Sequence, residues 1–146
     1  MIDLITMNKS DILRHRLIKM ISSINGDDDV DKSIILWDQM ASKIISIVGE
    51  NGFKSLYVRS LQICTIKFSW LSSYNPKSES NNQFNGLKIC LKKQTSHQIA
   101  DVNFELLITL TDILASLIGE PITIKILCMA WGDVATEFVS KELNNE

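Results

Sequence analysis

One short pattern occurs twice in this chain, and it constrains the fold more than any other feature. Residues 44–50 (IISIVGE) and residues 114–120 (LASLIGE) each end an apolar, helix-like stretch with glycine and glutamate, and a second apolar segment follows each. Glycine commonly ends helices, and an acidic residue suits the start of the next helix, where the backbone dipole is positive. The pattern predicts a helical hairpin that is built twice.

Apolar residues recur at three- and four-residue intervals along most of the remaining chain, which is typical of amphipathic helices. A chain of 146 residues has the length of one domain. We therefore expect an all-α fold, a compact bundle of about five to six helices formed by two similar hairpins, in a single domain spanning residues 1–146. The predicted helices cover residues 10–24, 33–48, 52–71, 87–93, 96–118 and 121–143, with a polar flexible loop at 72–86.

Composition narrows the class of protein. Fifteen basic and 17 acidic residues give a net charge of −2, which argues against a dedicated nucleic-acid binder. The widely spaced Cys64, Cys90 and Cys128 form no zinc or disulfide pattern, so we expect a reducing, cytoplasmic environment. The longest apolar stretch, 106–118, is too short to span a bilayer and contains Asp112. These features predict a soluble protein without a membrane segment.

Two local patterns resemble known binding motifs but lack residues that those motifs require. Asp27, Asp29 and Asp31 alternate as in a calcium-binding loop, yet Lys32 stands where the sharp turn needs glycine. Ala115 and Gly119 have the spacing of a DNA-binding helix-turn-helix. Glu120 and Lys125, however, occupy positions that the motif would bury. We therefore expect no metal site and no DNA-reading hairpin.

The sequence offers little support for catalysis. His15 and His97 belong to no recognisable nucleophile or metal motif, and no glycine-rich phosphate loop is present. Glu50 and Glu120 would approach each other if the hairpins were symmetric, but a role at helix starts is favoured. We expect no enzyme and no cofactor. The alternative is a ligand-binding or enzymatic protein with a polar pocket between the hairpins, lined by Glu50, Glu120 and Asp112.

A second alternative concerns basic side chains. The first predicted helix is rich in them, and the segment 87–93 adds three lysines. If these side chains converged, they would form a phosphate-contacting surface of a nucleic-acid-associated regulator. The favoured interpretation is that they solubilise separate helix faces, so nucleic acid is an unlikely partner. The residues concerned are Lys9, Arg14, Arg16, Lys19, Lys88, Lys92 and Lys93.

The most specific functional hypothesis comes from the predicted helix 52–71, which carries two apolar stripes. Its main face is continuous, and Arg59, Ile63, Ile66 and Trp70 align on another side. Tryptophan and arginine beside aliphatic residues are typical of interface hot spots, although a buried helix would place the same stripe in the core. We predict a non-enzymatic protein-binding module, an adaptor, regulator or subunit, whose partner is another protein or a second copy in a homodimer.

Overall fold

The computed structural model describes residues 9–24, 26, 29–74 and 84–144, and within these ranges all regular structure is helical. No strand occurs in the described ranges, which confirms the predicted all-α class and the choice of a helix rather than a strand near residues 87–93. The elements are α2 (Lys9–Ile24), α3 (Val30–Thr65), the 3₁₀ helix η1 (Ser69–Ser73), α4 (Asn85–Lys92), α5 (Ser96–Ile118), α6 (Glu120–Trp131) and α7 (Asp133–Asn144).

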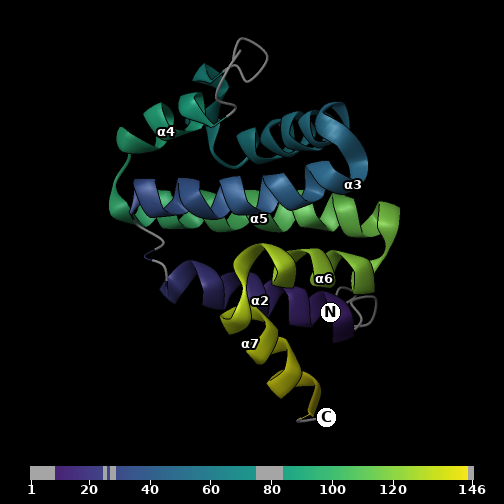
Figure 1. Cartoon of the computed structure of the whole chain (residues 1–146). Coiled ribbons are helices and arrows are strands. Elements are labelled where there is room, and N and C mark those ends of the chain that lie inside the picture. The colour runs from purple at the N-terminus through teal and green to yellow at the C-terminus, as the bar shows by residue number, and fades with distance from the viewer. Residues whose placement is uncertain (1–8, 25, 27–28, 75–83, 145–146) are drawn as a thin grey trace, which may run out of the picture.

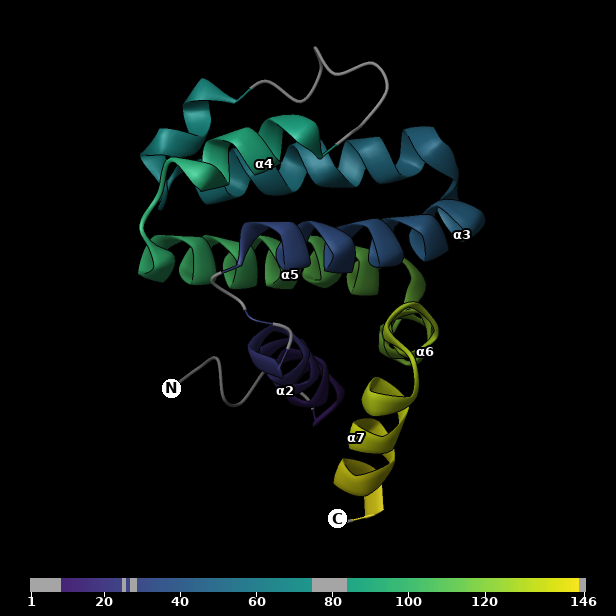
Figure 2. The ribbon, with the colours of Figure 1, turned by 60° about the vertical axis from the view of Figure 1, so that its left-hand side comes forward.

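The helices form three layers (Figures 1 and 2). The first segment of α3 and α5 lie side by side in the middle layer. The second segment of α3 lies above them with α4 and η1, and α2, α6 and α7 lie below. Among the described elements, the second segment of α3 therefore has neighbours on its lower side and along α4.

The repeated sequence pattern is a repeated backbone turn. Gly49 interrupts α3 with φ 83° and ψ 166°, and Gly119 separates α5 from α6 with φ 95° and ψ 153°. This region of backbone space is essentially restricted to glycine. The two hairpins predicted from the sequence are thus confirmed, and both turn with nearly the same backbone conformation.

A third turn of this kind corrects one prediction. Gly132 has φ 84° and ψ −158° and separates α6 from α7, so the single helix predicted over 121–143 was wrong. Here too an acidic residue, Asp133, begins the following helix. The apolar spacing continues across Gly132, and that continuity concealed the break.

Two helix boundaries also differ from their predicted positions. α3 ends at Thr65 rather than near residue 71, because the chain turns there and brings Leu71, which is 1% exposed, back onto the core. The β-branched pair Thr65 and Ile66 has only modest helix propensity, which favours an end at this point. α5 is capped by Thr95, one residue before the predicted Ser96, in a reciprocal capping box with Gln98.

Aromatic side chains fill the space between the middle and upper layers. Trp37 lies at the centre, with ring centroids 5.7 Å from Tyr57 and 5.6 Å from Phe84. Its indole nitrogen donates to Oδ1 of Asn103 at 2.7 Å, so the first segment of α3 is joined to α5 by a buried hydrogen bond. The apolar stripe predicted for 33–48 is therefore core.

Parts of the predicted loop 72–86 and the last two residues lie outside the described residues. Among the described helices, none combines the length and the apolar character that crossing a bilayer requires.

The glycine turn gives a first testable prediction. Gly49→Ala should lower the free energy of unfolding by about 1–3 kcal/mol, because alanine is strained at this φ and ψ. A methyl group at Gly49 would meet no atom within 4 Å, so packing does not contribute. Gln39→Ala, at an exposed position of the same helix, is the matched control and should be neutral or slightly stabilising. Urea denaturation measures both, and equal stability of the two variants would contradict the strained turn.

Candidate functional site

The predicted docking residues lie at the end of α3, in the upper layer. Arg59 and Ile63 are one helical turn apart and both are exposed, and Ile66 follows directly after the helix with 88% of its surface accessible. The opposite face of the same segment is buried core, including Phe53, Leu61 and Cys64. We call Arg59, Ile63 and Ile66 the docking ridge.

Trp70 differs from the other three predicted residues. It lies in η1 rather than on α3, its side chain is half-buried, and it packs against the core. Its ring centroid is 6.3 Å from that of Phe68. Trp70 therefore supports the turn that follows the ridge, and only part of its ring remains accessible.

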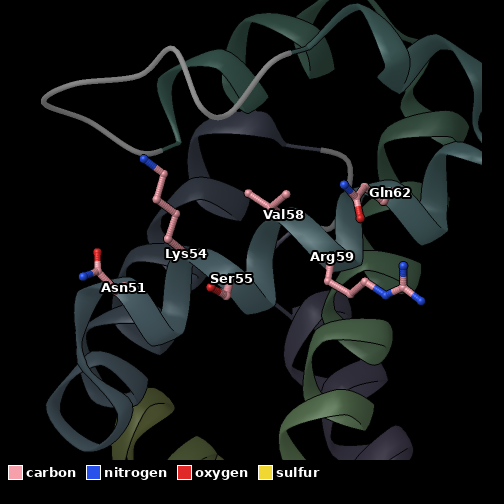
Figure 3. Close-up of a pocket in the computed structure, with 6 residues that line it drawn as sticks. All are labelled: Asn51, Lys54, Ser55, Val58, Arg59 and Gln62. Carbon is pink, nitrogen blue, oxygen red and sulfur yellow. The ribbon is translucent and has the colours of Figure 1, made fainter.

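A groove borders the ridge and shares Arg59 with it (Figure 3). It has a volume of about 630 Å³ and runs along the outer face of the second α3 segment. Lys54 and Arg59 extend away from each other on either side of Val58 (Figure 3). The lining residues are Asn51, Lys54, Ser55, Val58, Arg59 and Gln62. These described lining residues comprise two cations, three neutral hydrogen-bonding side chains and one apolar side chain, and none of them is an acid.

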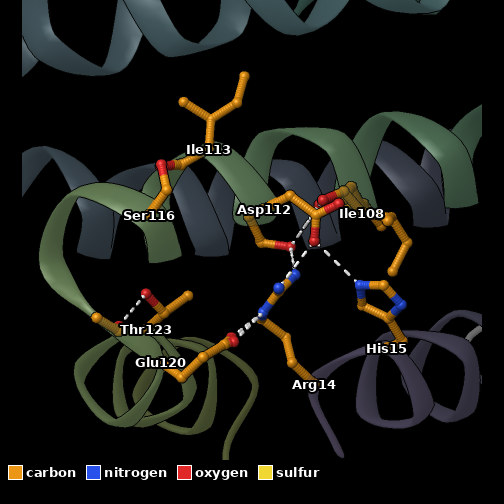
Figure 4. A network of polar contacts seen from close by, with 11 residues as sticks. Arg14, His15, Ile108, Asp112, Ile113, Ser116, Glu120 and Thr123 are labelled. Atoms are coloured by element: carbon orange, nitrogen blue, oxygen red, sulfur yellow. Dashed lines mark hydrogen bonds and ion pairs between the residues drawn. The ribbon is translucent and has the colours of Figure 1, made fainter. Parts of the chain in front are cut away.

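The densest polar cluster lies elsewhere, where α2 meets α5 and α6 (Figure 4). The side chain of Arg14 is only 2% exposed. Its Nε lies 2.5 Å and 3.0 Å from the carboxylate oxygens of Glu120, Nη1 donates to Thr111 at 2.7 Å, and Nη2 is 2.8 Å from Asp112. All three nitrogens of the guanidinium are engaged by the protein itself.

Asp112 is shared between Arg14 and His15, whose Nε2 lies 3.0 Å from the same carboxylate oxygen. Burial is the largest single influence on the pKa of Asp112 and raises it. The hydrogen bonds and charges of His15 and Arg14 oppose that influence, and together they hold the pKa below its ordinary value. For Arg14, likewise, burial lowers the pKa, but Glu120 and Asp112 outweigh it and raise the pKa.

This cluster changes the interpretation of the carboxylates that the sequence singled out. Glu120 and Asp112 both form ion pairs with Arg14, whereas Glu50 is exposed at the turn of α3. A shared proton between two carboxylates requires that they lack such a cation. The arrangement favours a structural role for Glu120 and Asp112 over acid–base chemistry.

The basic residues of the alternative nucleic-acid hypothesis are mostly engaged within the protein. Arg14 is buried, Arg16 pairs with Glu142, and the ammonium of Lys19 lies 5.2 Å from the ring centroid of Phe104. Lys88 and Lys92 both face Asp31. The side chain of Lys9 lies outside the described residues. These basic side chains are therefore engaged at separate places, and their charges do not form one continuous positive surface.

The acidic loop resembling a calcium site can be followed in part. Asp27 and Asp28 lie outside the described residues. Asp29 caps α3 by accepting a hydrogen bond from the backbone N–H of Lys32 at 3.2 Å, and Asp31 pairs with Lys88 at 3.1 Å. The described residues contain no group of three or more histidine, cysteine or acidic side chains that could hold a metal ion.

Two features of the structure were not predicted from the sequence, the burial of Arg14 and the groove on α3. The burial of Arg14 had no local signal, because its partners lie 97 to 106 residues away in the sequence. The groove had a signal: its residues recur at helical spacing between 51 and 62 as a polar strip without acids.

Comparisons of the chain with protein-family models, with curated proteins and with solved structures gave no significant match. Function is therefore inferred from the geometry of the described surfaces.

The ionic cluster predicts a large effect on stability. Arg14→Met should lower the free energy of unfolding by about 3–5 kcal/mol, because it leaves the nearly buried Glu120 without its cation. The double variant Arg14→Met/Glu120→Met should recover part of the lost free energy of unfolding, because it no longer leaves a buried carboxylate without its cation. Arg16→Met, which removes an exposed pair, should cost less than about 1 kcal/mol. Chemical denaturation of the wild type and these three variants tests the prediction, and equal costs for Arg14→Met and Arg16→Met would refute the stabilising role of the buried Arg14 ion pairs.

The lowered pKa of Asp112 predicts a dependence of stability on pH. A carboxylate whose pKa is lower in the folded than in the unfolded state stabilises the fold above its ordinary value of 3.8. That stabilisation is lost as the pH falls through the lowered value. Asp112→Asn should therefore be less stable than the wild type at pH 6, and the difference should shrink below about pH 4. Denaturation curves across this range test the prediction, and a constant difference would contradict it.

Proposed function

We propose that this protein is a non-enzymatic, helical protein-binding module that receives its partner on the docking ridge. The observation that carries the proposal is the exposure of Ile66, at 88%, beside the exposed Ile63 and Arg59. Arginine is one of the residues enriched in interface hot spots, and burial of the aliphatic side chains beside it would add desolvation energy.

The position of the ridge supports this proposal. Arg59 and Ile63 lie on the second segment of α3, and Ile66 is the residue that caps its end; the opposite face of the segment is fixed by the aromatic core around Tyr57 and Trp37. A partner would therefore meet a surface held on a rigid, well-packed element, which limits the loss of conformational freedom on binding.

The use of the charged groups elsewhere also favours binding over catalysis. In the cluster around Arg14, the ionisable side chains bind one another: Arg14 pairs with Glu120 and Asp112, and Asp112 also contacts His15. A catalytic acid or base must instead reach a substrate atom within hydrogen-bond distance. The acidic members of the cluster are occupied by Arg14 and His15.

Ile66→Asp should abolish partner binding without affecting folding, because the side chain is exposed and a carboxylate in an apolar interface would be desolvated. Ile47→Asp, on the same helix with 53% exposure, is the matched control. Tagged wild type and both variants would be compared as baits in extracts of the cells that produce the protein. Light scattering of the purified proteins would report self-association.

The expected result is one or more proteins, or a second copy, whose association falls at least tenfold with Ile66→Asp and is retained with Ile47→Asp. Circular dichroism and thermal unfolding confirm that both variants fold. Identical capture and identical scattering for all three proteins would refute a binding role for the ridge. Trp70 is less suitable as a test position, since its packing against the core would couple binding to stability.

A further inference from the structure

We infer that the partner segment is an acidic amphipathic helix that lies along the outer face of the second α3 segment. Its carboxylates would face the groove and its apolar side chains would cover the docking ridge. This inference rests on the proposed function and specifies the chemistry of the partner.

The groove and the ridge form one continuous surface. Gln62 of the groove precedes Ile63 of the ridge, and Arg59 belongs to both. The surface is cationic and polar around Lys54 and becomes apolar towards Ile66. From Lys54 to Ile66 a helix rises about 18 Å, at 1.5 Å per residue. A partner helix of about three to four turns would match this length.

The charge of the groove is not neutralised within the described chain. Neither Lys54 nor Arg59 takes part in any ion pair among the described residues, whereas Lys67 binds Glu105 and Lys88 binds Asp31. The described residues that line the groove include no acidic side chain. Carboxylates on a partner would supply the complementary charge, and Arg59 would bind one of them in a bidentate manner.

The neutral lining residues fit the same partner. Asn51, Ser55 and Gln62 can donate hydrogen bonds to carboxylates or to polar side chains at the rim, and Val58 gives the groove an apolar centre. An apolar centre with a polar rim is the usual anatomy of a protein interface.

A protein helix explains this surface better than nucleic acid does. Two cations would provide little phosphate affinity, with a salt dependence of about two released counterions. The exposed Ile63 and Ile66 would remain without a role against a phosphate backbone. A helix with an acidic end and an apolar end would engage both parts of the surface.

A designed peptide tests the inference directly. The probe is a fluorescent amphipathic helix of about 14 residues, with leucines spaced to cover the ridge and glutamates spaced to face Lys54 and Arg59. A second peptide carries lysine in place of each glutamate. Binding to the full chain is measured by fluorescence anisotropy, with a single-stranded RNA oligonucleotide of similar length as a further probe.

The acidic peptide should bind the wild type at least tenfold more tightly than the lysine peptide. The double variant Lys54→Glu/Arg59→Glu should reverse this preference, and Lys125→Glu, at an exposed position of α6, is the control and should not. No binding of the acidic peptide, equal binding of both peptides, or an equal effect of the control would overturn the inference. Tighter binding of RNA that is lost with the double variant would overturn it in favour of nucleic acid.

The same titration separates this inference from the proposed function. If Ile66→Asp abolishes binding while Lys54→Glu/Arg59→Glu leaves it unchanged, the ridge is a docking surface and the acidic partner is refuted. If neither variant changes the binding of the peptide, and Ile66→Asp captures the same proteins as the wild type, both proposals fail.

Discussion

The buried guanidinium of Arg14 imposes the strictest requirement in this structure. A charge withdrawn from water costs several kcal/mol unless its hydrogen bonds and its counter-charges are supplied by the protein. Glu120, Asp112 and Thr111 supply them, and the hydroxyl of Thr111 in turn donates to a backbone oxygen of its own helix. Because these partners come from α5 and α6, the cluster sets how α2 meets both helices. α7 in turn packs on α2 and α6.

In the upper layer, by contrast, apolar side chains remain exposed to solvent. The second segment of α3 buries one side in an aromatic core, and on its other side Ile63 and the following Ile66 are not covered by the described chain. The Gly49 turn places the segment there, because it carries the chain from the middle layer to the upper one. The architecture thus connects a sequence-encoded turn with the exposure of Ile63 and Ile66.

Local signals in the sequence predicted most of the fold. Apolar spacing indicated the helices and their buried faces, and the glycine–glutamate pattern indicated the turns at Gly49 and Gly119. The break at Gly132 had the same signal, glycine followed by an acid, but it was missed because apolar residues continue beyond it. The sequence placed Arg59, Ile63, Ile66 and Trp70 on one helical stripe, but the helix ends at Thr65, so Trp70 lies in η1, and only the structure shows which of the four are exposed. Arg14 appeared as one of several basic residues, since burial by partners about 100 positions away leaves no trace in local pattern.

The placement of α2 has a consequence for how the protein is made. Its principal neighbours are α5, α6 and α7, so α2 packs against helices that lie far along the chain from it and are synthesised later. Synthesis proceeds from the N-terminus, and contacts between distant segments form late because a long loop must close first. Until residue 120 has left the ribosome, Arg14 of α2 lacks Glu120, and the apolar side of α2 lacks its contacts with α6 and α7. α2 therefore stays incompletely docked until α6 and α7 have been synthesised. A chaperone or a protease would bind the exposed side of α2 during that interval.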